Sequence, residues 1–271
     1  LYDSPVPEWR LDNLYLMYAI SIPLEEIRQS HVQAKQQLLA EVERKSGVRL
    51  DPAAMTLGFA RRATAYKRAD MLFSDLERMR RIARGGLPLQ VIYGGKAHPR
   101  DEGGKALMRR VFELAAMLKD DMRIVYLEEY DLSLAKLICA GVDLWLNTPQ
   151  KPREASGTSG MKAALNGVPS FSVLDGWWVE GHAEGITGWS IGDGAEPESD
   201  AEKEARSLYD KLEHTILPLY YERPTEYARV MRSAIAVNGS FFNAQRMVFQ
   251  YLRNAYLAGK SPIQLEGSVV I

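Results

Sequence analysis

The fold is decided by residues 89–146, which read LQVIYGGKAHPRDEGGKALMRRVFELAAMLKDDMRIVYLEEYDLSLAKLICAGVDLWL. Short apolar runs in this stretch alternate with longer segments whose apolar residues recur at helical spacing. The expected strands are Leu89–Tyr93, Arg123–Leu127 and Val142–Leu146, and the expected helices are Asp101–Leu118 and Leu132–Ala140. Alternating strands and helices are typical of a parallel sheet with helices on both faces, so this stretch predicts an α/β fold.

The alternation continues on both sides of the stretch. The further expected strands are Ala54–Ala60, Val168–Val173 and an extended piece over Ile186–Ile191, and the further helices are Tyr66–Ala83 and Gly160–Asn166. Together they predict a Rossmann-like parallel sheet flanked by helices. Because ligands bind beyond the carboxyl ends of the strands in such sheets, chemistry is expected in the loops that follow them.

Helices are also expected at both ends of the chain. One covers Leu24–Lys45 and ends at Gly47, and three follow the sheet, over Ala201–Leu217, Pro224–Val237 and Phe241–Leu257. The last of these has a broad apolar and aromatic face. This face either packs on the chain's own sheet or covers another domain.

The composition narrows the classes of partner. With 34 basic and 35 acidic residues, the formal net charge is −1, which leaves no general electrostatic footprint for nucleic acid or anionic lipid. No stretch approaches the ~20 apolar residues of a membrane span. Cys139 is the single cysteine, so no internal disulfide can form; we expect a buried, inert thiol and a cytoplasmic location. The four histidines are scattered without ligand spacing, so no metal site is expected.

A basic cluster follows the first expected strand. Arg61, Arg62, Lys67 and Arg68 lie within eight residues, at the start of an expected helix whose dipole would favour anions. Guanidinium groups match the geometry of phosphate oxygens. The cluster therefore indicates a phosphate site, the alternative being a solvated basic helix start with surface ion pairs.

A second cluster, Glu154–Lys162, follows the strand that ends near Leu146. Gly157 and Gly160 would let a ligand approach the backbone, and hydroxyls lie between them. Lys162 is expected just inside the start of a helix, where a lysine can form a Schiff base. The alternative is a Gly/Ser turn that caps a helix. Neither a Walker A loop nor a GxGxxG fingerprint is present.

Two weaker candidates follow other strands. Carboxylates in the run 128–131 could serve as acids or bases, although Asp131 equally suits the cap of the next helix. His98, in the loop 94–99, is a further candidate. Two anion-friendly loops at one edge of the sheet together indicate at least one phosphorylated ligand.

The second cluster carries a family resemblance. The run Glu154–Gly167, EASGTSGMKAALNG, closely resembles the lysine motif that binds pyridoxal phosphate in α-glucan (glycogen, starch and maltodextrin) phosphorylases. Arg61–Arg68 resembles the phosphate-site motif of that family, KRxHEYKR, and residues 89–105 and 129–134 match its intervening loops in order. The resemblance covers roughly residues 10–258.

Some positions depart from the better-known members. Arg61 stands where they carry Lys, Thr64 and Ala65 replace His and Glu, and Ser159-Gly160 replaces Gly-Asn. These differences indicate the shorter prokaryotic branch of the family.

The resemblance implies roles for particular residues. Lys162 would hold pyridoxal 5′-phosphate covalently, and the 5′-phosphate of the cofactor would exchange a proton with the substrate phosphate. Arg62 and Lys67 would bind the substrate phosphate and, with Lys162, make up the catalytic set. The expected cofactor contacts are Arg61, Tyr66, Tyr130, Gly157, Thr158 and Ser159, and the expected contacts to glucose hydroxyls are Glu154, Ser156 and Gly157.

The resemblance also implies a reaction and a larger protein. The reaction would be reversible phosphorolysis of an α-1,4-glucan to α-glucose 1-phosphate with retention. The chain would be the C-terminal half of a two-domain glycosyltransferase of the GT-B type, inactive without its N-terminal half. Its parts would be an interdomain linker (1–23), a Rossmann-like cofactor- and phosphate-binding domain (24–240), and a C-terminal helix and tail (241–271) that docks on the N-terminal domain.

Two other functions stay open from the sequence. One is a nucleotide-sugar glycosyltransferase of the glycogen synthase type, which shares the fold but usually carries Glu at the position of Lys162. The other is a non-catalytic module that binds glucan or phosphate. Whether the protein forms a homo-oligomer is also left open.

Overall fold

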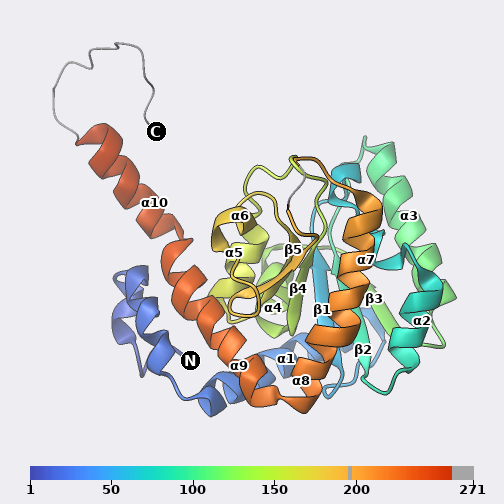
Figure 1. Ribbon diagram of the computed structural model, residues 1–271, viewed down its shortest axis with the longest axis horizontal. Coiled ribbons are helices and arrows are strands. Elements are labelled where there is room, and N and C mark those ends of the chain that lie inside the picture. Colours follow the sequence, from blue (N-terminus) through green and yellow to red (C-terminus); the bar gives the residue numbers. More distant parts are fainter. Residues whose placement is uncertain (195–196, 258–271) are drawn as a thin grey trace, which may run out of the picture.

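A single parallel sheet forms the centre of the computed structural model, which describes residues 1–194 and 197–257 (Figure 1). Its six strands are ordered β3-β2-β1-β4-β5-β6, and every neighbouring pair is parallel. The strands are β1 Met55–Ala60, β2 Leu89–Gly94, β3 Arg123–Leu127, β4 Leu144–Asn147, β5 Ser170–Val173 and β6 Gly188–Ile191. This order and direction confirm the predicted Rossmann-like α/β fold.

Helices cover both faces of the sheet. They are α1 Leu24–Ser46, α2 Leu76–Arg84, α3 Glu102–Met117, α4 Leu132–Gly141, α5 Thr158–Leu165, α6 Trp178–Gly181, α7 Ala201–Lys211, α8 Leu217–Glu222, α9 Pro224–Ser233 and α10 Ala244–Tyr251. Short π-helical turns extend α7, α9 and α10. Aspartates cap the amino ends of several helices; at α4, Asp131 Oδ1 accepts from the N–H of Leu134 at 2.8 Å. Gly47 ends α1 in the left-handed conformation.

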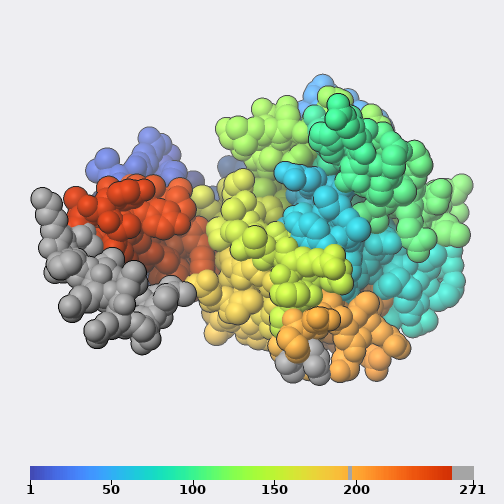
Figure 2. All heavy atoms as spheres, turned by 90° about the horizontal axis from the view of Figure 1, so that it is seen from above, coloured from blue at the N-terminus to red at the C-terminus, as the bar shows by residue number. Residues whose placement is uncertain are grey.

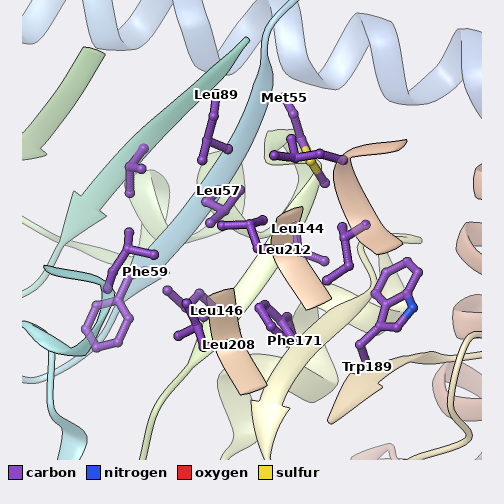
Figure 3. Close-up of a cluster of buried hydrophobic side chains, with 14 of the residues drawn as sticks. Met55, Leu57, Phe59, Leu89, Leu144, Leu146, Phe171, Trp189, Leu208 and Leu212 are labelled. Atoms are coloured by element: carbon purple, nitrogen blue, oxygen red, sulfur yellow. The ribbon is translucent and has the colours of Figure 1, made fainter. Parts of the chain in front are cut away.

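The strands bury side chains on both faces. Leu57 and Phe59 of β1 face the larger core, which Figure 3 shows closed by Leu208 and Leu212 from the α7 side. The opposite face carries Trp145 of β4, packed with side chains of α1 and α4. Alternation with a period of two, with both faces apolar, is the pattern of a sheet covered on both sides.

The helix predicted over Tyr66–Ala83 is wrong in its first half. Residues 65–67 and 71–73 form separate 3₁₀ turns, and α2 begins only at Leu76, capped by Asp75. Arg68 interrupts the helix because it adopts a left-handed conformation with φ +44°.

Residues 1–22, the first segment, lie beside α10 (Figure 2), and hydrogen bonds of Gln245 with Leu11 and Asn13 join the two. Leu16 and Ala19 of the first segment are buried against the core, whereas the aromatic and aliphatic side chains of α10 are largely exposed. Figure 1 shows α10 projecting away from the sheet, so the alternative in which it packs on its own sheet is wrong. Docking of α10 on another domain stays a prediction. Among the described residues, no helix has the length and hydrophobicity needed to cross a bilayer.

Candidate active site

The sheet positions both sequence clusters at one edge. β1 lies between β2 and β4, so the connections from β1 and from β4 leave in opposite directions and open a crevice at the carboxyl ends of these two strands. The basic run begins directly after β1, and the second cluster follows β4. The expectation that both meet at one edge is confirmed.

A cavity of about 400 Å³ lies between the two loops. It is lined by Ala60, Arg61, Arg62, Lys67, Tyr130, Glu154, Ala155, Ser156, Gly157, Thr158 and Ser159. Most of the predicted contacts to phosphate and sugar therefore face the same space. Tyr66 does not line it; its ring lies 5.0 Å from the Nζ of Lys67.

A carboxylate links two of the cations. Oε2 of Glu154 accepts from Nη2 of Arg61 at 2.6 Å and lies 3.4 Å from Nζ of Lys67. Arg62 is exposed and forms no ion pair or hydrogen bond within the part of the chain that the structure describes. The cavity thus offers one free guanidinium beside two cations that share one negative charge, which suits an incoming dianion.

The predicted helix dipole at the basic run is wrong. Arg61–Thr64 are irregular, and the turn that follows is a 3₁₀ turn of three residues. An anion bound here would be held by side-chain charge, because no α-helix begins at this loop.

The loop 154–160 is held by a segment that sequence reasoning missed. The N–H of Glu154 donates to Oδ2 of Asp175 at 2.8 Å, and the N–H of Trp177 donates to the carbonyl of Ser156 at 2.8 Å. A Cβ on Gly160 would lie 2.8 Å from Nε1 of Trp177. The expectation that Gly160 admits a ligand is wrong, since the indole ring fills that space. The run Asp-Gly-Trp-Trp at 175–178, directly after a strand, was the available signal.

Lys162 faces a second, adjoining cavity of about 630 Å³. This cavity shares Ser156 and Thr158 with the first and is closed on its far side by residues 241–251. Lys162 is exposed and is the fifth of the eight residues of α5, so its predicted place just inside the helix start is wrong.

Burial changes the pKa of two groups of the candidate site, Cys139 and Tyr130. Burial raises the pKa of the Cys139 thiol to about 12, against the opposing influence of the Lys162 cation. Burial also raises the pKa of Tyr130 to about 12, so its phenol keeps its proton at neutral pH. Cys139 is therefore a neutral packing residue, as expected.

The weaker candidates lie elsewhere. His98 is exposed, and its Nδ1 accepts from the N–H of Arg100. Glu128 and Glu129 are exposed and line neither cavity. Within residues 1–194 and 197–257, no three His, Cys, Asp or Glu side chains are grouped to hold a metal ion.

The residues present fit pyridoxal phosphate. Nη1 of Arg61 and Oγ of Ser159 are buried atoms that find no hydrogen-bond partner among the described residues. Such donors favour an acceptor that carries several oxygens, as a phosphate ester does. The Lys162 amine in the adjoining cavity suits the aldehyde of the same molecule.

Comparison with known proteins agrees with these observations. Residues 10–258 match the family of carbohydrate phosphorylases. The chain is 42% identical over 258 residues to the maltodextrin phosphorylase of Thermococcus litoralis, covering 89% of this chain and 31% of that protein. It is 39% identical over 259 residues to the glycogen phosphorylase of Aquifex aeolicus, covering 87% and 37%, and 40% identical over 215 residues to that of Mycobacterium tuberculosis H37Rv, covering 76% and 25%. It thus spans between a quarter and just over a third of the length of these relatives. Because the family match extends over most of its length, this chain belongs to the carbohydrate phosphorylase family.

Proposed function

We propose that the polypeptide containing this chain cleaves α-1,4-glucans with inorganic phosphate and releases α-glucose 1-phosphate. One observation carries the proposal: the cations that follow β1 and the loop 154–159 line one cavity, beside the cavity that Lys162 faces. The names of the relatives, maltodextrin and glycogen phosphorylase, support the same reaction.

The substrate phosphate is bound by Arg62 and Lys67. Arg62 is free to turn its fork toward phosphate oxygens, and Lys67 adds a second positive charge. These cations also stabilise the negative charge that develops when the glycosidic bond breaks. Glu154, Ser156 and Gly157 bind glucose hydroxyls, since the same loop forms the wall beside the cations.

The cofactor site uses the remaining residues of the two cavities. Lys162 would hold pyridoxal phosphate covalently, and Tyr130 would lie beside it; Tyr66 lines neither cavity and has no contact in this arrangement. Arg61, Gly157, Thr158 and Ser159 bind its ester phosphate. When bound, the cofactor supplies a phosphate group whose second pKa of about 6 lets it give and take a proton at neutral pH.

A second domain completes the site. Lys162 is exposed, and Met247 and Tyr251 of α10 line the cavity that it faces. Further apolar side chains are exposed on the first segment and on α10: Leu11, Leu14, Met17, Tyr18, Val248 and Phe249. Gln245 ties these two surfaces together, accepting from the N–H of Asn13 at 2.6 Å and donating to the carbonyl of Leu11. A domain that docks on this joint surface would cover Lys162, and the chain alone is expected to be inactive.

The test compares two reactions of the whole polypeptide: phosphorolysis of a glucan, and glucan synthesis from a nucleotide sugar. Maltodextrin with inorganic phosphate is expected to yield glucose 1-phosphate, and Arg62→Ala is expected to reduce turnover by roughly 10²-fold. Arg81→Ala, on the exposed side of α2, is the matched control and should change nothing. Glucan synthesis from a nucleotide sugar without phosphorolysis, or glucan binding without turnover, would replace the proposal with one of its rivals.

A further inference from the structure

Arg68 is the one cation of the basic run that does not line the cavity. Its side chain turns away, and only 15% of it is exposed. Nε donates to the carbonyl of Thr148 at 2.9 Å, and Nη2 donates to the carbonyl of Pro149 at 2.6 Å. The Arg68 side chain, adjacent to Lys67 in sequence, is therefore hydrogen-bonded to the loop that follows β4.

The loop that follows β4 also donates hydrogen bonds to the basic run. Oγ1 of Thr148 donates to the carbonyls of Lys67 and Arg68, at 2.9 and 3.0 Å. The N–H of Gln150 donates to the carbonyl of Tyr66 at 2.6 Å. Residues 66–68 and 148–150 are thus joined by hydrogen bonds in both directions, and Lys67 lies in the middle of the joined segment.

A carboxylate from α7 anchors the guanidinium. Oε2 of Glu204 lies 2.6 Å from Nη2 of Arg68, and Glu204 is 6% exposed. The contact is an ion pair by distance, though not an aligned hydrogen bond. Meeting two carbonyls and a carboxylate at once requires a planar fork, which Arg has and Lys lacks.

The backbone of Arg68 is itself unusual. Its φ of +44° is a left-handed conformation that a residue with a side chain seldom adopts unless surrounding contacts enforce it. The contacts to Thr148, Pro149 and Glu204 are the ones that enforce it here. Without them, the peptide between Lys67 and Arg68 would relax toward a common conformation and reorient Lys67.

We propose that Arg68 is a positioning residue for phosphate binding: with Thr148 and Glu204, it fixes the backbone of Lys67 so that the ammonium faces the cavity. The proposal rests on the proposed function, because it assigns Lys67 to the substrate phosphate. Arg68 touches neither phosphate nor sugar, and it acts through Lys67.

The test separates positioning from general stability. Arg68→Lys in the whole polypeptide keeps the charge and removes the fork. We expect the KM for phosphate to rise about tenfold, because a small misplacement of a binding group weakens binding by a factor of this order. The KM for glucan should change less than twofold. Thr148→Val removes the hydroxyl with little change of volume, and it should raise the KM for phosphate in the same selective way, by less. Arg110→Lys, at an exposed pair with Asp70, is the matched control and should alter neither constant.

Each outcome decides the proposal. It is overturned if both variants lower the melting temperature or kcat and leave the KM for phosphate unchanged. If the unmodified polypeptide shows no phosphorolysis, the proposed function fails instead, and calorimetric titration with inorganic phosphate decides the present proposal. Weaker phosphate binding by both variants, with binding unchanged in Arg110→Lys, supports it; equal binding by all of them overturns it.

Discussion

The ring of Trp177 packs against Gly160 in the first turn of α5, the helix that carries Lys162. A Cβ on Gly160 would lie 2.8 Å from Nε1 and 3.0 Å from Cζ2 of Trp177. Trp177 also holds the carbonyl of Ser156 and stacks edge-on against Phe242. Trp177 therefore holds the loop through its backbone N–H and packs against the first turn of α5 through its ring.

The first prediction concerns this contact. Gly160→Ala should lower the free energy of unfolding by about 1–3 kcal/mol, because the ring must move to admit the methyl group. Urea unfolding followed by tryptophan fluorescence measures the change. Gly103→Ala, on the exposed side of α3, is the control and should be neutral or stabilising by about 0.5–1 kcal/mol. An unchanged unfolding curve for Gly160→Ala would show that the indole does not need this glycine.

A buried ion cluster ties α1 to the amino ends of β1 and β4. Nζ of Lys35 lies 2.6 Å from Oδ2 of Asp143, and Nε2 of His31 lies 2.9 Å from Oδ1. The N–H of Thr56 donates to the same carboxylate at 2.7 Å. The cluster fixes the two strands whose opposite ends carry the site loops.

The second prediction follows from the cluster. Asp143→Asn should lower the free energy of unfolding by about 3–5 kcal/mol at pH 7, because it leaves the Lys35 ammonium buried without its carboxylate. The control is Asp120→Asn, at an exposed position in the turn between α3 and β3. This change should alter the free energy of unfolding by less than about 0.5 kcal/mol. An equal loss of unfolding free energy in the two variants would show that the buried ion cluster does not stabilise the fold.

The third prediction concerns pH. Burial raises the pKa of Asp143, but the Lys35 cation and the His31 hydrogen bond outweigh burial and hold the pKa below its ordinary value. A lowered pKa in the folded state stabilises the fold above the unfolded pKa of about 3.9, and this stabilisation is lost as pH falls through the folded pKa. The difference between wild type and Asp143→Asn should therefore shrink below about pH 4. A constant difference in urea unfolding from pH 7 to pH 3 would contradict this.

The sequence predicted elements whose cause is local and missed those whose cause is distant. Apolar runs and helical spacing located the strands and most helices, and the shared edge of the sheet followed from the direction of the strands. The break at Arg68 depends on Thr148 and Pro149, some 80 residues away along the chain. The packing of Gly160 likewise depends on Trp177, which lies on a different element.

At the scale of the whole chain, the hydrophobic core does not extend over the outer surfaces of the first segment and α10, where apolar side chains are exposed. Figure 1 shows α10 projecting away from the sheet, and Met247 and Tyr251 of α10 line the same cavity as Lys162. Exposed apolar patches are typical of interfaces, as the proposed docking of a second domain requires. The fourth prediction tests whether the exposed surface of α10 docks on another domain in the whole polypeptide.

Val248→Lys should leave the stability of the isolated chain within about 0.5 kcal/mol, because Val248 is 50% exposed. In the whole polypeptide the same change should weaken domain docking and lower the rate of phosphorolysis. Val32→Lys on α1 matches it in exposure, at 51%, and should affect neither. Equal behaviour of the two variants in the enzyme assay would exclude the α10 surface from docking.

The most direct measurement locates the cofactor. The whole polypeptide is loaded with pyridoxal phosphate, reduced with borohydride and digested, and the labelled peptide is sequenced by mass spectrometry. The label is predicted on Lys162 and nowhere else, and Lys162→Arg should abolish both the label and phosphorolysis. A label on a different lysine, or glucan phosphorolysis by an unlabelled polypeptide, would contradict the site described here.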